Sequence, residues 1–473
     1  MPLPSRPYDA HVAAAPAPGS AARREQALRV LLAPDLAHVV ALVCWREGDL
    51  VHVADSTGHS TLAAGGATVV LAGLDPVAEQ DPLSDTGYPF AAVRLHSLFA
   101  DPRAPDLAVV HTDAHHWPDR GGHLGEHGSL GAVQSRAPFL LSGAGVTARG
   151  VLDRAVRTVD VGATLAHLSG GSYDDMDGRP VDLAQPGADH VVGLLWDGAQ
   201  CADLLLLAAS GQLPHVARLL RRGIALRGGA VAEFPSVTRV NHTCARTGVG
   251  PGRHGIVNNA FWDRATGEHV VPNSPETWHR AMDWLRPGVR TVFERLPEGT
   301  ASACVNDPVD VGATYSTFAL VRQLRGSGST LVGTLPPATG DPLATQEFVA
   351  THPDYAWGSQ VDASGLEQVL GLWREGEPPR LTWWNTTLTD GAHHAGGPAS
   401  PISRAGLRDA DARLGVWLDL VEQRGLLDRT TVLLTADHGM AAADPSVTGD
   451  WDAALEAAGV EFRDEAHGFL YLG

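Results

Sequence analysis

The residues with the clearest chemical potential are an aspartate and a histidine near the end of the chain. Asp437-His438-Gly439 comes shortly after Thr431–Leu434, a short apolar and β-branched run. Such a run is typical of a buried parallel strand, and α/β sheets place ligands at the carboxyl ends of these strands. Adjacent carboxylate and imidazole groups suit a divalent cation such as Zn²⁺. Taken alone, the pair could equally be an ordinary polar turn.

Three further polar groups follow apolar segments: Asp197, Thr238, and the pair Asp390 and His394. The strands predicted before the first and third groups are Val191–Trp196 and Leu381–Thr387. A single aspartate at a strand end is usually a cap or turn residue. Asp390 and His394 are four residues apart before a Gly-Gly-Pro sequence, so they form either a two-ligand clip in a loop or a solvated polar turn.

The composition indicates a large globular protein with an acidic surface. The chain has 473 residues, of which 44% are hydrophobic and 19% are charged, and its formal net charge is −19. This charge argues against binding a nucleic-acid polymer through its phosphates. It is compatible with a small phosphate-bearing substrate, because a bound metal supplies its own positive charge. The oligomeric state stays open.

Cysteine spacing and the amino-terminal segment limit the cofactor and the location. The four cysteines are widely separated and form no C-x-x-C pair, so a cysteine-based zinc site is not expected. Residues 1–20 lack the basic and apolar regions of a secretory signal, and no apolar run is long enough to span a membrane. A cytoplasmic location is the default expectation.

The order of the expected elements predicts a parallel sheet covered by helices. In the later part of the chain we expect strands at 191–196, 381–387 and 431–434, and helices at 204–222, from Thr238 to Thr247, and at 402–424. In the earlier part we expect a mobile arm at 1–25, a helix or strand and a small antiparallel sheet within 26–72, strands at 106–111 and 136–143, a helix at 159–168 and a linker at 169–189. Alternation of strands and helices is typical of α/β proteins.

Five motifs occur in an order that resembles the alkaline phosphatase superfamily. They are Asp197-Gly198, Thr238-x-x-Asn241-His242, His254-Gly255-Ile256-Val257-Asn258-Asn259, Asp390-x-x-x-His394 and Asp437-His438-Gly439-Met440. The sequence is most similar to the nucleotide pyrophosphatase/phosphodiesterase branch, with phosphonoacetate hydrolases close by. The resemblance implies an α/β fold with an alkaline-phosphatase-like, mostly parallel sheet sandwiched by helices, and a small cap subdomain.

The resemblance also implies two zinc ions, although other divalent metals are possible. One ion would be held by Asp197, Thr238, Asp437 and His438. The other would be held by Asp390, His394 and one further histidine. Coordination would lower the pKa of the Thr238 hydroxyl so that it can attack phosphorus.

The further histidine is the ligand whose position departs from the usual order. In the family it follows Asp-His-Gly, but the only histidine after Met440 is His467, whose context resembles a cap strand. Gly125–Gly131, which contains His127, matches the expected motif instead. We therefore expect a circular permutation in which residues 1–185 are the second half of the catalytic domain and residues 186–473 its first half. A tandem pair with a decayed first copy is the alternative.

The implied function is a metal-dependent phosphoric-ester hydrolase, most simply a phosphodiesterase or nucleotide pyrophosphatase acting on a small phosphate ester. Thr238 would be the nucleophile, and Asn259 would donate to a phosphoryl oxygen or else cap a loop. Arg239 stands where nucleotide-cleaving relatives commonly have an aromatic residue, which leaves a nucleotide preference open. The alternatives are a phosphomonoesterase, a phosphonate hydrolase, or a non-catalytic relative that binds metal or phosphate. His115, His116 and His123 are interpreted as polar loop residues or outer ligands.

Overall fold

An eight-stranded sheet forms the centre of the larger part of the molecule. This computed structural model describes residues 20–118, 121–147, 149–325 and 353–473. In spatial order the strands are β17 (Tyr315–Ser316), β16 (Ser302–Val305), β18 (Leu381–Thr386), β11 (His190–Trp196), β19 (Thr430–Thr435), β8 (Phe139–Gly143), β12 (Gly223–Leu226) and β9 (Gly150–Leu152). All neighbours are parallel except β8, which is antiparallel to both β19 and β12.

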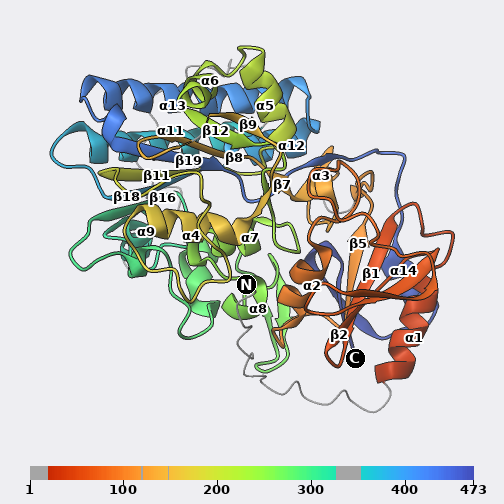
Figure 1. Ribbon diagram of the computed structural model, residues 1–473. Coiled ribbons are helices and arrows are strands. Elements are labelled where there is room, and N and C mark those ends of the chain that lie inside the picture. Colours follow the sequence, from red (N-terminus) through yellow and green to blue (C-terminus); the bar gives the residue numbers. More distant parts are fainter. Residues whose placement is uncertain (1–19, 119–120, 148, 326–352) are drawn as a thin grey trace.

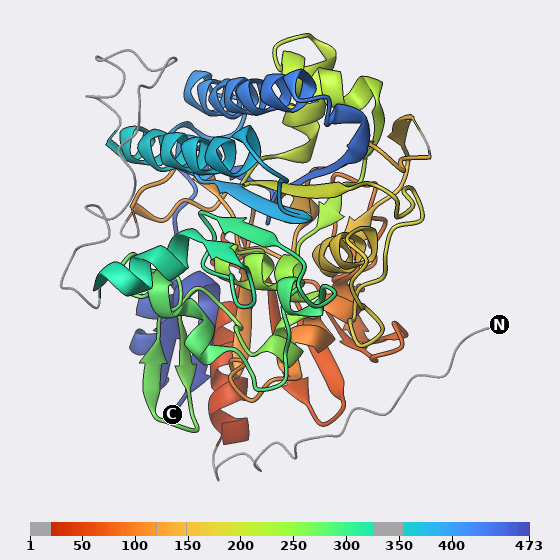
Figure 2. The ribbon, with the colours of Figure 1, turned by 90° about the vertical axis from the view of Figure 1, so that its left-hand side faces the viewer.

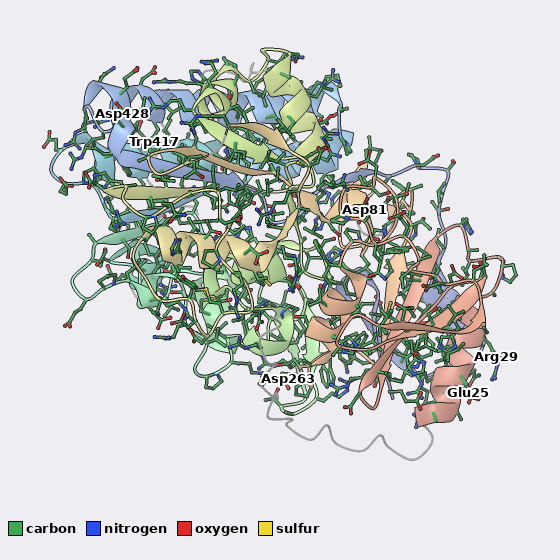
Figure 3. The ribbon with its side chains drawn as sticks, viewed as in Figure 1. Glu25, Arg29, Asp81, Asp263, Trp417 and Asp428 are labelled. Atoms are coloured by element: carbon green, nitrogen blue, oxygen red, sulfur yellow. The ribbon has the colours of Figure 1, made fainter. Side chains whose placement is uncertain are left out.

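Helices cover both faces of this sheet (Figure 1). On one face lie α5 (Cys201–Ala209), α6 (Pro214–Arg221), α11 (Pro353–Arg374) and α13 (Pro401–Gln423), and on the other lie α4 (Thr158–Leu168), α7 (Thr238–Thr247) and α9 (Thr317–Arg325). Trp417 of α13, labelled in Figure 3, lies among the helices over the first of these faces. Its ring packs edge-on against Trp373 of α11, with centroids 5.2 Å apart. The central strands are buried along their whole length, as a sheet covered on both faces requires. The predicted α/β class with a mostly parallel sheet is confirmed.

A second, antiparallel sheet forms the smaller part of the molecule beside the first (Figures 1 and 2). Its strands are, in order, β21 (Phe462–Glu465), β22 (Phe469–Leu472), β5 (Leu107–His111), β1 (Val40–Glu47), β2 (Leu50–Ala54), β3 (Gly58–Leu62) and β4 (Thr68–Gly73). One face packs against α1 (Ser20–Leu31) and α14 (Trp451–Ala457), and the other packs against α2 (Ala91–Phe99).

Both sheets combine strands from the two ends of the sequence. In the large sheet, β8 lies between β12 and β19, which follow it in the chain by many residues. In the second sheet, the final strand β22 pairs with β5. Residues 1–185 and 186–473 therefore share the hydrogen bonding of both sheets.

The structure corrects several predicted element boundaries. Asp390 and His394 lie in a helix, α12 (Leu388–Gly396), and not in a loop. The helix predicted over 204–222 is divided into α5 and α6. Pro138, which has no backbone N–H, separates β7 (Arg136–Ala137) from β8, where one strand was predicted. Residues 20–25 belong to α1, and the rest of the predicted arm lies outside the described residues.

Within the described part of the chain, no helix combines the length and apolar character needed to cross a lipid bilayer.

Candidate active site

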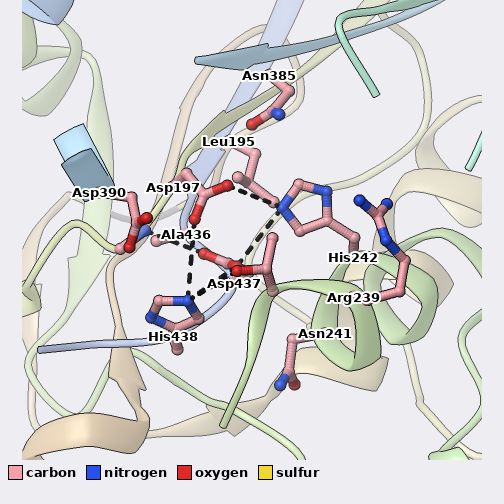
Figure 4. Close-up of polar contacts among 12 residues, drawn as sticks. Leu195, Asp197, Arg239, Asn241, His242, Asn385, Asp390, Ala436, Asp437 and His438 are labelled. Atoms are coloured by element: carbon pink, nitrogen blue, oxygen red, sulfur yellow. Dashed lines mark hydrogen bonds and ion pairs between the residues drawn. The ribbon is translucent and has the colours of Figure 1, made fainter. Parts of the chain in front are cut away.

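Two aspartates meet at the carboxyl edge of the large sheet. Asp197 follows β11 and Asp437 follows the neighbouring strand β19, and both side chains are buried. Nε2 of His438 lies 3.2 Å from Oδ2 of Asp437 and 3.8 Å from Oδ1 of Asp197 (Figure 4). Because parallel neighbours end at the same edge, two sequence positions far apart come together around His438.

A third carboxylate approaches this pair from α12. Asp390 and His394 are one helical turn apart on the same face, with Nε2 of His394 3.5 Å from Oδ1 of Asp390. Gly198 allows the approach: it has φ +64°, and a Cβ there would lie 2.6 Å from Oδ1 of Asp390. Steric constraint therefore explains the glycine of the Asp-Gly motif, because any larger residue at position 198 would push Asp390 away from Asp197.

His127 brings the early part of the chain into the same cluster. It follows β6 (Gly125–Glu126), which pairs with β20 (Ala441–Ala442) just after the Asp437-His438 motif. Its ring stacks on that of His438, with centroids 3.8 Å apart and 17° between the planes. The His394 ring centroid is 5.1 Å away.

Hydrogen bonds determine which nitrogen each of these imidazoles presents to the cluster. Nδ1 of His127 lies 3.0 Å from the carbonyl of Ser236, Nδ1 of His394 lies 2.7 Å from that of Gly125, and Nδ1 of His438 lies 2.9 Å from that of Gly439. A carbonyl only accepts, so Nδ1 carries the proton in each case. In the neutral ring, Nε2 is then left with a lone pair, which is the arrangement typical of metal-binding histidines.

Thr238 is the first residue of α7, and its side chain is half-buried. Its Oγ lies 3.4 Å from Nε2 of His438. The first backbone N–H groups of a helix have no intrahelical partner and favour negative charge nearby. The hydroxyl is thus placed where an alkoxide or a phosphoryl oxygen would be stabilised, beside the carboxylate cluster.

The electrostatics of the cluster fit a bound cation. Burial, followed by repulsion from Asp437 and Asp390, raises the pKa of Asp197 well above its ordinary value. Oδ1 of Asp197, Oδ1 of Asp390 and Oδ2 of Asp437 are buried and accept no hydrogen bond from the described residues. Three carboxylates this close repel one another unless protons or cations intervene. Oxygen donors together with imidazole nitrogens suit zinc and similar divalent ions.

The residues form overlapping groups with the spacing of metal ligands. In each group the candidate ligand atoms lie within 4.8 Å of one another, and the groups are His127/Asp390/His394, Asp197/Asp390/His438, Asp197/His242/Asp437 and His123/Glu126/His394. The first two groups contain only residues that the sequence predicted as ligands. The structure therefore brings all the predicted side-chain ligands into one site.

Asn259 is held at the start of α7 by Arg239, the residue after Thr238. Oδ1 of Asn259 accepts a hydrogen bond of 2.9 Å from the backbone N–H of Arg239. Its amide Nδ2 is left as the group that can donate. Arg239 is buried, and it lines a cavity of about 80 Å³ together with Thr238 and Trp278.

Comparison with known families agrees with this geometry. The model for the type I phosphodiesterase / nucleotide pyrophosphatase family matches residues 191–472. The chain belongs to this family. The resemblance stated from the motifs is confirmed. The match begins in β11 and ends in β22, so it includes Thr238 and Asp390 but not His127.

Curated members and relatives of the family match parts of the chain. An uncharacterized pyrophosphatase/phosphodiesterase of Schizosaccharomyces pombe is 24% identical over 239 residues, which are 50% of this chain and 42% of that protein. Alkaline phosphatase PafA of Elizabethkingia meningoseptica is 24% identical over 43% of this chain and 36% of its own length. Ectonucleotide pyrophosphatase/phosphodiesterase family member 3 of Mus musculus is 24% identical over 48% and 22%. The chain thus spans less than half the length of the curated relatives it matches.

Solved structures match a similar portion. Murine ectonucleotide pyrophosphatase/phosphodiesterase 5 is 19% identical with a TM-score of 0.36, covering 54% of this chain and 59% of that chain. Phosphonoacetate hydrolase of Sinorhizobium meliloti 1021 is 22% identical with a TM-score of 0.36, covering 57% and 60%.

His242 and Asp307 belong to the site but were given no role from the sequence. Nε2 of His242 lies 3.4 Å from Oδ2 of Asp197 and 3.5 Å from Oδ2 of Asp437 (Figure 4). Its Nδ1 lies 3.0 Å from Oδ2 of Asp307, which follows β16. Two sequence signals could have identified these residues. His242 belongs to the Thr238-x-x-Asn241-His242 motif, and Asp307 follows a strand.

The remaining early histidines separate into two places. Nδ1 of His123 lies 3.5 Å from Oε1 of Glu126, close to His394 and the edge of the cluster. His115 and His116 instead line a different cavity of about 310 Å³ beside Trp451. His467 lies near the cluster without belonging to a ligand group among the described residues, with its ring centroid 5.4 Å from that of His127.

Proposed function

We propose that this protein is a metal-dependent phosphoric-ester hydrolase of the phosphodiesterase type. The observation that carries the proposal is the position of the Thr238 hydroxyl at the start of α7, 3.4 Å from Nε2 of His438 and beside three clustered carboxylates. A hydroxyl, a helix N-terminus and a cation-binding cluster are the components that an in-line displacement at phosphorus requires. Membership of the type I phosphodiesterase / nucleotide pyrophosphatase family supports the same activity.

Thr238 would act as the nucleophile. Its Oγ forms a bond to phosphorus while the opposite P–O ester bond breaks, and the leaving oxygen departs with the bonding electrons. The hydroxyl proton passes to solvent, and water then hydrolyses the phosphothreonine and restores the side chain. Covalent catalysis of this kind divides one difficult substitution into two easier ones.

The candidate ligands divide into two neighbouring sets, which the group Asp197/Asp390/His438 links. As the family resemblance implies, Asp197, Thr238, Asp437 and His438 would hold one divalent cation. Asp390, His394 and His127, which form one ligand group, would hold another. Zinc suits these donors, and it would neutralise the carboxylates, lower the pKa of the Thr238 hydroxyl and stabilise charge on the leaving oxygen. The hydrogen bonds from Nδ1 keep the three imidazoles oriented for this role.

One of two neighbouring features, the apolar cavity, favours a diester over a monoester, and the other serves either ester. Nδ2 of Asn259 can donate to a non-bridging phosphoryl oxygen, because Oδ1 is held by the backbone N–H of Arg239. The cavity beside Thr238 includes Trp278 and Phe318, which offer an apolar surface to a second ester group. A monoester has no such group to place there.

Hydrolysis of two model esters tests the proposal. Purified protein with added Zn²⁺ should hydrolyse bis-p-nitrophenyl phosphate faster than p-nitrophenyl phosphate, and a chelator should remove the activity. A preference for the monoester would favour the alkaline-phosphatase type of activity, which the similarity to PafA makes the second candidate. Absence of turnover with both esters and every divalent metal would support a non-catalytic binding role.

We also propose that the catalytic domain is circularly permuted, with residues 186–473 as its first half and residues 1–185 as its second. The shared sheets support this arrangement over a decayed tandem copy, because β8 lies inside the large sheet and β5 pairs with β22. The carboxyl end also lies close to α1, where Arg23 and Glu461 form an ion pair of 3.7 Å. Proximity of the carboxyl end to α1 makes permutation physically easier.

A further inference from the structure

The cavity beside Thr238 contains a buried positive charge that the catalytic site does not use. Arg239 is 3% exposed and extends from α7 on the same side as His242 (Figure 4). It lines the cavity of about 80 Å³ that begins at Thr238 and Asp197. The walls farther from these residues are largely aromatic and aliphatic, and they include Trp278, whose ring centroid lies 5.9 Å from that of Trp357.

Arg239 makes few of the interactions that a buried guanidinium normally makes. Its Nη2 donates a hydrogen bond of 3.0 Å to Oδ1 of Asn273. Nε and Nη1 have no hydrogen-bond partner among the residues that the structure describes. Among the described residues, no carboxylate forms a salt bridge with Arg239 within 4.0 Å. A buried guanidinium stays charged, so this arrangement is unfavourable until an acceptor arrives.

Two other buried arginines show which partners the protein provides for this group elsewhere. Arg246, on the same helix, also has no hydrogen-bond partner for Nε and Nη1 among the described residues. Its Nη2, however, donates to the carboxylate of Asp307 at 2.6 Å, and that carboxylate also contacts His242. In the described part of the chain Arg94 has no carboxylate partner within 4.0 Å either, but it donates three hydrogen bonds, to two carbonyls and to a serine hydroxyl. Asp307 is therefore already occupied. Among the described residues, Arg239 differs from Arg246 because its guanidinium has no carboxylate partner, and from Arg94 because it makes one hydrogen bond and not three.

The anchoring of Arg239 directs it toward the aromatic end of the cavity. Oδ1 of Asn273 accepts from Arg239 and also from Nε1 of Trp278, at 3.1 Å. This shared acceptor ties the guanidinium to the indole, on the side away from the cluster around Asp437. A group recognised there would belong to the substituent of the phosphoric ester and not to the phosphoryl group that is transferred.

We propose that Arg239 binds an anionic group on one ester substituent, so that the substrate is a phosphoric diester with a second negative charge on an apolar or aromatic substituent. This inference rests on the proposed function and adds a substrate class to it. A carboxylate or a second phosphoryl group would supply the acceptors that Nε and Nη1 lack, because the planar guanidinium matches either group with two parallel hydrogen bonds. Trp278 and Trp357 would contact the body of the substituent.

A matched set of aryl esters tests the proposal. The probes are phenyl p-nitrophenyl phosphate, its 3-carboxyphenyl analogue and its 3-carbamoylphenyl analogue, which separates charge from hydrogen bonding. The wild-type protein should show kcat/KM at least roughly tenfold higher for the carboxylate than for the phenyl ester, as a charge-assisted hydrogen bond predicts. The carbamoyl ester should fall between them. Equal kcat/KM values for the carboxylate and phenyl esters would overturn the proposal.

Variants assign the preference to the guanidinium. Arg239→Met should reduce the carboxylate-to-phenyl ratio to about one, and Arg239→Lys should keep part of it. The control is Arg322→Met, which removes an arginine of α9 that pairs with Asp310 and does not line the cavity; it should leave the ratio unchanged. If Arg239→Met lowers turnover of both esters equally and keeps the ratio, Arg239 acts on the transferred phosphoryl group and the proposal is wrong.

A binding measurement separates this inference from the proposed function. Calorimetry with 3-carboxyphenylphosphonate and phenylphosphonate compares the same two substituents without turnover. Tighter binding of the carboxylate that is lost in Arg239→Met supports the anion site even if no ester is hydrolysed, in which case the proposed function alone fails. Hydrolysis without any carboxylate preference in either assay leaves the hydrolase standing and removes the anion site.

Discussion

The imidazoles of His127 and His438 stack with their centroids 3.8 Å apart, although they come from opposite ends of the chain. Each ring donates Nδ1–H to a backbone carbonyl, so both Nε2 atoms are available to the carboxylate cluster. Burial, together with His438 and His394, holds the pKa of His127 well below its ordinary value. His127 is therefore neutral near pH 7, which is the form that binds a metal ion.

Replacing His127 with alanine should remove one ligand of the cation proposed at Asp390 and His394. We expect the zinc content to fall from about two ions per chain to about one, because a site of three protein ligands loses most of its affinity with one of them. Metal analysis of the dialysed protein measures the change, and circular dichroism checks that the fold is kept.

His467→Ala is the matched control for this experiment. Its ring is only 5.4 Å from that of His127, but it belongs to none of the ligand groups formed by the described residues. Its zinc content should stay at the wild-type value. Loss of zinc in His467→Ala with retention in His127→Ala would show that the ligand follows the Asp-His-Gly motif after all, and would contradict the permuted arrangement.

Replacing Thr238 with alanine should lower turnover of bis-p-nitrophenyl phosphate by roughly a thousandfold or more, because the attacking oxygen is removed. Thr238→Ser keeps the hydroxyl and should retain a measurable part of the activity. Steady-state kinetics at saturating zinc gives both values. Activity of Thr238→Ala close to that of the wild type would exclude Thr238 as the nucleophile.

The metal-free protein should gain stability when one carboxylate of the cluster is neutralised. The pKa of Asp197 is raised by burial and by Asp437 and Asp390, so the folded state holds its proton to a higher pH than the unfolded state. Above the unfolded pKa of 3.8, stability from this group is progressively lost as pH rises through the folded pKa. In chelator-treated protein at pH 8, the free energy of unfolding of Asp197→Asn should therefore exceed that of the wild type by on the order of 1 kcal/mol or more. The variant should accordingly unfold at a higher temperature.

Added zinc should reverse this order. The wild type should gain more thermal stability from zinc than Asp197→Asn, because binding to the folded state stabilises it in proportion to affinity. Differential scanning calorimetry with and without chelator measures both effects. A metal-free wild type that is more stable than Asp197→Asn at pH 8 would show that the carboxylates do not repel one another in solution.

The sequence was sufficient to predict those parts of the site in which a polar side chain directly follows a predicted strand. Asp197 and Asp437 could be predicted to meet, because each follows an apolar run and parallel strands end at a common edge. The helix opened by Thr238 was predicted and is observed as α7. His127 was selected by its motif, and its role as a ligand remains a prediction.

Other features depend on packing that no local pattern reveals. Gly391, Gly396 and Gly397 gave the segment around Asp390 the composition of a loop, but packing against α11 and α13 keeps it helical. Among the described residues Arg239 lacks a carboxylate partner because Asp307 pairs with Arg246 instead, and this pairing is set by the tertiary structure. Such pairings follow from tertiary contacts between α7 and the segment after β16, which spacing along the chain does not determine.

The proposed permutation predicts how fragments and rearranged chains will behave. Residues 186–473 alone should not fold into a cooperative unit, because β19 and β12 would lose the strand between them and β22 would lose β5. A chain that begins at residue 186, continues to Gly473 and then runs from Met1 to residue 185 should instead fold and bind zinc like the wild type. Thermal unfolding and zinc content compare the two designs, and a stable zinc-binding 186–473 fragment would favour the tandem-copy interpretation.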